Sequence, residues 1–171
     1  MFRRVVYQYY TNVNYLTCEQ CLALHGLIRR KPEAFPRIDH DCASSILPIL
    51  RKELRQSREK SRRMRLRAQG ELARRSLFER ALSILPIEPD ESLELLARAA
   101  SIDLYIPDIE RLVQTHDGFL RSHPDLRDRL RRQWLKAYSD KFGWRRYELL
   151  PEVMRLQREK AGLARIQELL G

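Results

Sequence analysis

Residues 1–17 contain many aromatic and β-branched side chains, with polar residues between them. Such side chains are typical of strands, and the Thr-Asn-Val-Asn sequence at 11–14 is typical of a turn, so this stretch predicts a strand, a turn and a second short strand. The following segment, 18–42, contains two prolines and is predicted to be mostly loop. Pro48 then predicts the transition into a helix.

Between residues 49 and 85, apolar and small side chains recur every three or four positions, which is the period of an α-helix. The middle of this stripe is polar, because Ser57 and Ser61 stand where a core helix would carry large apolar side chains. Residues 51–67 also contain nine basic side chains and only two acidic ones. Residues 49–70 are therefore predicted to form a projecting, solvated basic helix that acts as a connector.

The remainder of the chain has a denser apolar pattern, in which prolines next to acidic residues mark the starts of helices. The last break is expected at 139–143. The predicted helices are 71–85, 90–101, 107–121, 124–141 and 145–169. The aromatic side chains near the end, Trp134, Tyr138, Phe142 and Trp144, are predicted to form the core between the last helices. The alternative is a single-strand or RNA-binding surface, because basic residues alternate with these aromatic ones. The fold class is thus mostly α, with a small N-terminal β module.

Three cysteines and a histidine form the clearest chemical pattern, Cys18-x2-Cys21-x18-His40-x-Cys42. A Cys-x2-Cys turn directs two thiolates to one point, and two further nitrogen or sulfur ligands complete the tetrahedron that zinc prefers. His40 and Cys42 are two residues apart, so they face the same side of an extended segment. Four protein ligands leave no open position, which predicts a structural Zn²⁺. His25 is an alternative fourth ligand, and a second alternative is three free thiols packed as small apolar side chains.

The segment 10–26, Tyr-Thr-Asn-Val-Asn-Tyr-Leu-Thr-Cys-Glu-Gln-Cys-Leu-Ala-Leu-His-Gly, is followed at 39–48 by Asp-His-Asp-Cys-Ala-Ser-Ser-Ile-Leu-Pro. Together the two segments resemble the C-terminal motif of phage Mu F-like minor head proteins. The resemblance implies that the three cysteines are metal ligands. That motif usually has a His-x2-Cys-x-Cys spacing, whereas this chain has His40-x-Cys42, and Ser44 stands in place of the last cysteine.

A second resemblance concerns residues 71–113. The sequences at 80–85, 90–103 and 106–108 resemble a tetratricopeptide-type helical hairpin that runs into a second unit. Small side chains such as Ala81 would allow close helix contact there. The resemblance implies a helical-repeat-like scaffold, and an ordinary antiparallel helical bundle is the alternative.

The chain has 171 residues, and 43% of them are hydrophobic, which is enough for a buried core. The mean hydropathy is −0.54, no apolar run is long enough for a membrane span, and the N-terminus lacks the pattern of a signal peptide. Clustered cysteines in odd number also favour a reducing compartment, so a cytoplasmic location is expected. The expected division is a zinc-knuckle module at 1–48, a basic connector helix at 49–70 and a helical domain at 71–171.

The formal charge is +10, and most of the 33 basic residues are arginine. Arginine suits bidentate contacts with phosphate, so the charge favours a polyanionic partner, RNA or DNA, or a ribonucleoprotein assembly. The residues expected to bind it are Arg51, Lys52, Arg55, Arg58, Arg62, Arg63 and Arg65. No hydrolase, nucleotide-triphosphatase or dinucleotide-binding motif is present, so a non-enzymatic adaptor is expected. The alternative is a protein-interaction or assembly module, phage head-like or helical-repeat-like, whose charge is incidental.

Overall fold

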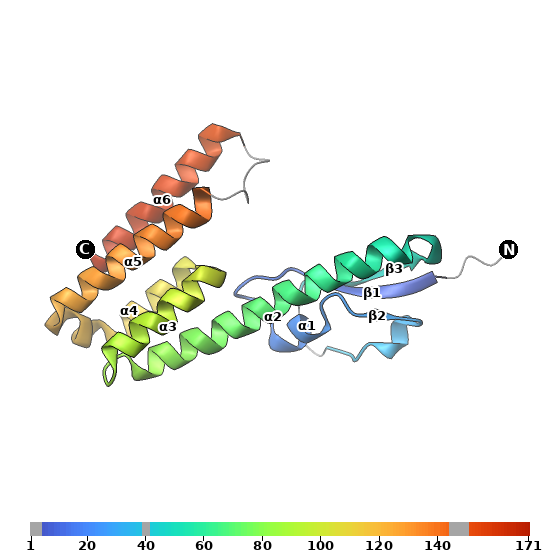
Figure 1. Cartoon of the computed structure of the whole chain (residues 1–171), viewed down its shortest axis with the longest axis horizontal. Coiled ribbons are helices and arrows are strands. Elements are labelled where there is room, and N and C mark those ends of the chain that lie inside the picture. Colours follow the sequence, from blue (N-terminus) through green and yellow to red (C-terminus); the bar gives the residue numbers. More distant parts are fainter. Residues whose placement is uncertain (1–4, 39–41, 144–150) are drawn as a thin grey trace. The chain divides into compact units, whose positions relative to one another are not determined.

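The computed structural model describes residues 5–38, 42–143 and 151–171, without the side chains of Arg51, Phe142 and Gly143. The chain divides into two compact units, Met1–Ala73 and Arg74–Gly171. Among the described residues there are six α-helices and one three-stranded sheet (Figure 1), which confirms the mostly α class with a small N-terminal β module.

The first unit is built around a central strand, β1 (Val5–Thr11). It pairs antiparallel on one side with the short strand β2 (Ile28–Arg29), where Tyr7 lies opposite Arg29. On the other side it pairs antiparallel over seven residues with β3 (Ser44–Leu50). The sheet order β2-β1-β3 leaves β3 as an edge strand with Pro48 in its interior.

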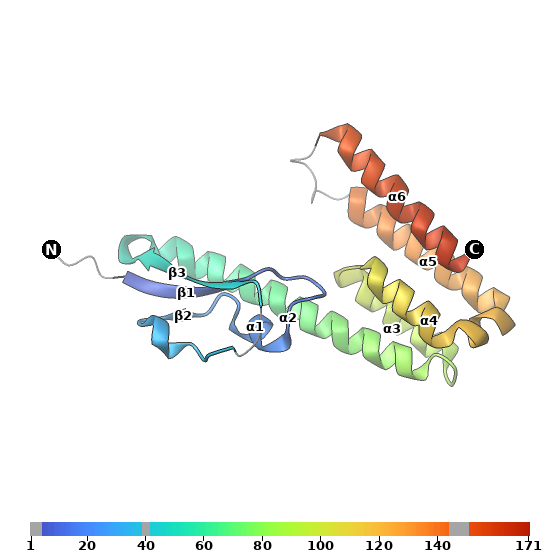
Figure 2. The ribbon, with the colours of Figure 1, turned by 180° about the vertical axis from the view of Figure 1, so that it is seen from behind.

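Short helical elements fill the connections of the first unit. Helix α1 (Glu19–Leu24) joins β1 to β2, the 3₁₀ helix η1 (Pro32–Ala34) follows β2, and η2 (Arg51–Glu53) follows β3. Helix α2 (Leu54–Ile84) then begins in the first unit and ends in the second. In both views the start of α2 lies alongside the sheet (Figures 1 and 2).

The structure corrects three local predictions in this unit. The expected second strand within 1–17 is wrong, because Thr17 N–H donates to the Asn14 carbonyl at 3.2 Å and closes a turn there. The stretch 44–50, where Pro48 was expected to start a helix, is a strand, because pairing with β1 along its whole length outweighs local propensity. The cysteine segment is also less irregular than expected, since it contains α1.

The basic helix is not a projecting, solvated one as predicted. The stripe of Ser61, Met64 and Ala68 is buried, and Ala68 packs with Val13 and Leu22 of the N-terminal module. The serine that suggested a solvated helix is 4% exposed. Its small size permits a close main-chain contact, which the sequence pattern alone did not reveal.

The second unit consists of the end of α2 and four further helices. These are α3 (Pro89–Ile102), α4 (Ile106–Ser122), α5 (Pro124–Gly143) and α6 (Glu152–Leu170). The first three agree with the predicted helices within two residues at each end. The predicted helix 71–85 is the second half of α2, and α6 corresponds to the predicted 145–169 from residue 152 onward. Residues 145–150 of that prediction lie outside the described residues.

One continuous apolar core holds the second unit together. Its fully buried side chains come from every helix of the unit, for example Ala81, Leu96, Ile109, Trp134 and Ile166. The prediction that the late aromatic residues form a core is confirmed for Trp134 and Tyr138, which are 1% and 7% exposed. The side chain of Phe142 and the whole of Trp144 lie outside the described residues.

Two glycines of the second unit are expected to respond oppositely to replacement by alanine. A Cβ at Gly162 of α6 would overlap the Tyr138 ring of α5, whereas a Cβ at the exposed Gly118 of α4 would meet no atom within 4 Å. Gly162→Ala should therefore cost about 1–3 kcal/mol of unfolding free energy through overpacking. Gly118→Ala should add about 0.5–1 kcal/mol, because alanine loses less backbone entropy in a helix. Thermal or urea unfolding of the two variants checks this, and equal shifts would contradict the α5–α6 packing.

Candidate metal centre

The start of α1 positions the first two cysteines. Cys18 is the N-cap of α1 with an extended backbone (φ −65°, ψ 156°), and its Sγ accepts a hydrogen bond from the Cys21 N–H at 3.2 Å. Cys21 is one turn further on and is fully buried. The Cys-x2-Cys turn thus brings both thiols to one side, as the spacing predicted.

The third cysteine reaches the same point from the segment before β3. Cys42 Sγ lies 3.4 Å from Cys18 Sγ, and the three sulfurs all lie within 4.8 Å of one another. A zinc ion bound tetrahedrally at about 2.3 Å from each sulfur would hold them about 3.8 Å apart. The three cysteines can therefore hold a metal ion with little movement.

The surroundings of the thiols are apolar and aromatic. Tyr9, Cys21 and Phe35 form a small buried core, in which the Tyr9 hydroxyl lies 3.3 Å from Cys21 Sγ. Burial raises the pKa of the Cys21 thiol to about 11 and the pKa of the Tyr9 phenol to about 12. Cys21 is therefore protonated at neutral pH unless a cation replaces the proton and stabilises the thiolate.

The two histidines considered as fourth ligand differ in what the structure describes. His40 lies outside the described residues, so its role as ligand stays a prediction. His25 is buried, its Nδ1 accepts a hydrogen bond from the Thr11 N–H at 3.1 Å, and its ring lies against Tyr10. Burial and the Arg67 charge lower its pKa. Among the described residues the candidate metal group contains only the three cysteines, so His25 supports the fold instead.

The predicted nucleic-acid residues of α2 and η2 are exposed wherever their side chains are described. Arg51 is the exception, since its side chain is not described. The helical period places Arg55, Arg58, Arg62 and Arg65 within about 80° of one another, on one flank of the buried stripe. We call these four residues the arginine row. Glu53 lies in η2, before α2, whereas Glu59 lies beside the row as the i+4 neighbour of Arg55, and its carboxylate pairs with Arg63 at 2.6 Å.

Most of the net positive charge lies in the first unit. Residues 1–73 contain fifteen basic and seven acidic side chains, a formal charge of +8, whereas 74–171 contain eighteen and sixteen, which gives +2. Several arginines of the second unit are paired with carboxylates, for example Arg129 with Asp90 at 2.8 Å and Arg165 with Glu110 at 2.7 Å. The excess charge therefore lies in the same unit as the candidate metal centre.

The sequence did not predict the contact that joins the segment after α1 to helix α2. Gly26 has a positive φ of 80°, its N–H donates to the Tyr9 carbonyl at 2.9 Å, and its own carbonyl accepts a hydrogen bond from the Ser61 hydroxyl. A Cβ at Gly26 would lie 2.7 Å from the Ser61 carbonyl oxygen. We call this the Gly26–Ser61 contact. The sequence signal for this contact is a glycine shortly after α1 together with a serine within the apolar stripe of α2.

Comparisons with family models, curated proteins and solved structures find no match for this chain. No described helix is both long and apolar enough to cross a membrane. What the site can bind therefore follows from its own donor atoms and charges.

Removal of a sulfur ligand should remove the metal. Freshly purified, reduced protein is expected to contain about one zinc per chain, and Cys18→Ser or Cys42→Ser should reduce this strongly. Because metal binding contributes folding free energy, these variants should unfold the first unit and leave most helical circular dichroism of the second. His25→Asn is the control and should retain zinc at a lower melting temperature. Elemental analysis that finds no zinc in the wild-type protein would contradict the site.

Replacement of Gly26 should separate the module from α2. Gly26→Ala combines an unfavourable positive φ with a clash against the Ser61 main chain, so we expect a loss of about 1–3 kcal/mol. Ser61→Ala removes only the hydrogen bond and should cost about 1 kcal/mol. Thermal unfolding measures both, with the exposed Gln69→Ala as control. An unchanged melting temperature for Gly26→Ala would show that the contact contributes nothing.

Proposed function

We propose that this protein is a non-enzymatic adaptor in which a structural zinc ion stabilises an arginine-rich surface that binds nucleic acid, either bare or in a ribonucleoprotein. The zinc ligands are Cys18, Cys21 and Cys42, with His40 as the fourth. A set of three sulfurs and one nitrogen closes the tetrahedron and leaves no position for a substrate.

The observation that carries this proposal is that one face of α2 is buried against the rest of the first unit while a neighbouring face carries exposed arginines. One stripe of the helix packs on the metal module through Ser61, Met64 and Ala68. The arginine row lies on the neighbouring exposed flank, and the carboxylate beside it, Glu59, is paired with Arg63. The module therefore holds the helix and leaves the guanidinium groups accessible to a partner.

A row of exposed arginines suits the phosphate backbone better than it suits base edges. Contacts to phosphate position a protein on nucleic acid but carry little sequence information. Each neutralised phosphate releases condensed counterions, so the affinity of such a surface falls steeply with salt. We accordingly expect binding of general polyanion character, with little sequence preference.

A protein-assembly module, phage head-like or helical-repeat-like, is the second candidate. Exposed apolar side chains near the start of α6 favour it, since Val153 is 66% exposed and Met154 and Leu156 are each more than 40% exposed. Under this alternative the charge of the first unit has no nucleic-acid partner. The two candidates differ in a single measurable property, which is salt-dependent binding to RNA or DNA.

Reversal of charge on the arginine row is the test. Arg58, Arg62 and Arg65 replaced together by glutamate should weaken binding to a labelled oligonucleotide by at least tenfold and flatten its salt dependence. Fluorescence anisotropy at several salt concentrations measures both quantities, and circular dichroism should show nearly unchanged folding.

The matched control changes three exposed arginines of the second unit, Arg98, Arg132 and Arg158, to glutamate. It alters the net charge by the same amount, so it separates a local surface from a general charge effect. Wild-type protein that fails to bind at low salt, or equal binding by the row variant, would overturn the nucleic-acid function and leave the assembly module.

A further inference from the structure

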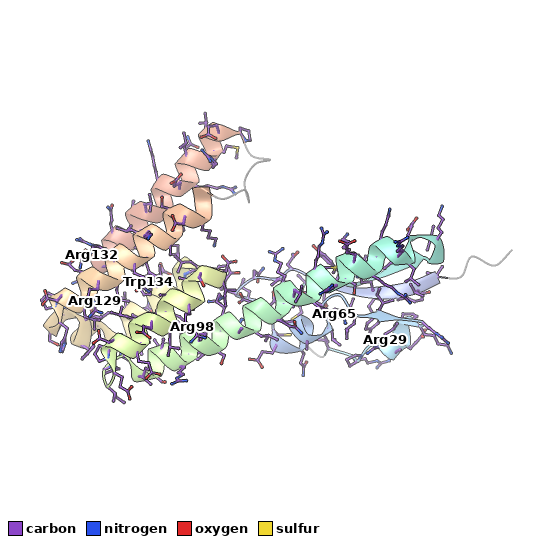
Figure 3. All side chains as sticks on the ribbon, viewed as in Figure 1. Arg29, Arg65, Arg98, Arg129, Arg132 and Trp134 are labelled. Carbon is purple, nitrogen blue, oxygen red and sulfur yellow. The ribbon has the colours of Figure 1, made fainter. Side chains whose placement is uncertain are left out.

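A hollow of about 540 Å³ lies in the first unit between the start of β1, the end of β2 and the start of α2. Its lining includes four apolar side chains, Val5, Val6, Ile28 and Leu54. Its polar lining consists of three arginines, Arg29, Arg30 and Arg58. We call it the arginine hollow; Figure 3 labels Arg29 at this end of the unit and Arg65 on α2.

The charged side chains that line the arginine hollow are all positive. No described carboxylate lines it, and none of its three arginines makes an ion pair with another described residue. The hollow between α3 and α5 in the second unit is different, because Asp103 and Asp140 line it and Lys141 is paired with Asp103 at 2.8 Å. Concave surfaces with low-dielectric walls and charge of one sign concentrate the field and attract counterions. The charge of the arginine hollow therefore favours the binding of an anion.

The four apolar side chains of the lining restrict which anion fits. A free phosphate ion would use the guanidinium groups and leave the apolar side chains exposed to water. A nucleotide combines a phosphate with a sugar and a base, and the volume of the hollow lies in the usual range for small-molecule sites, about 300–1,000 Å³. The lining thus matches a nucleotide better than it matches an isolated phosphate.

We propose that the arginine hollow binds one unstacked nucleotide of single-stranded nucleic acid, with its phosphate on Arg29, Arg30 and Arg58 and its sugar and base against Val6 and Leu54. This inference rests on the nucleic-acid function proposed above and names the form of nucleic acid. In a duplex the base is paired and stacked, so it cannot enter a hollow without an energetic cost of a few kcal/mol. A single strand presents its bases at no such cost.

The arginine hollow is continuous with the arginine row, because Arg58 belongs to both. With a rise of about 1.5 Å per residue, Arg65 lies roughly 10 Å further along α2 than Arg58. A strand whose nucleotide occupies the hollow can therefore pass its next phosphates along the helix. The proposed binding surface therefore extends from β2 to α2, and it is wider than the exposed face of α2 alone.

The test uses the full chain, a labelled oligouridine of about ten nucleotides and an RNA hairpin of matched length. The single strand should bind at least fivefold more tightly than the hairpin. Arg29→Ala combined with Arg30→Ala should weaken oligouridine binding about tenfold and lower the slope of log K against log salt by about 1.4, since each phosphate contact on a single strand contributes about 0.7. Arg58→Ala, on the helix instead of the strand, should lower the slope by about half as much.

Arg98→Ala combined with Arg132→Ala removes the same charge from the exposed surface of the second unit and should leave the affinity within twofold. Equal binding of strand and hairpin, or equal losses in the two double variants, would overturn the inference while the proposed function stands. Failure of the wild-type protein to bind either RNA would overturn both. Melting temperatures within a degree or two of the wild type confirm that the variants are folded.

Discussion

The first unit depends on one close main-chain approach, the Gly26–Ser61 contact. Gly26 donates its N–H to Tyr9 of β1 and lies between the end of α1 and the start of β2, so its position affects all three elements. Its carbonyl meets the Ser61 hydroxyl, and the absence of a Cβ lets the backbone lie against α2. The contact thus joins the segment after α1, the helix that begins at Cys18 and contains Cys21, to α2, which carries the arginine row.

The two units achieve stability by different means. The second has a single core to which every helix contributes, with fully buried Leu130, Trp134 and Ile166. Among its described residues the first has two small separate clusters, one around Tyr9, Cys21 and Phe35 and one around Val13, Leu22 and Ala68. Units with so little apolar core usually need a cross-link or a metal. A bound ion at the three cysteines would supply that link where burial cannot.

The parts that the sequence predicted well are those governed by local rules. Proline and acidic residues at helix starts located α3 to α5, and the Cys-x2-Cys spacing located the sulfur cluster. The errors came from long-range pairing: Ser61 is buried because Gly26 lies on it, and residues 44–50 form a strand because β1 provides a partner. Arg29 and Arg30 were overlooked for the same reason. They become neighbours of Arg58 only after β2 pairs with β1 beside the start of α2.

The position of Pro48 has a further consequence, for how the protein behaves at high concentration. β3 is an edge strand, and most of its side chains, including Ile46 and Leu47, are exposed. An edge of this kind is a template onto which the strand of another molecule can add, and such additions propagate into aggregates. Proline has no N–H to donate and is tolerated on edges where that group would face solvent. Pro48 therefore interrupts the free edge at its middle, and it protects an exposed apolar strand from self-association without any change in its pairing to β1.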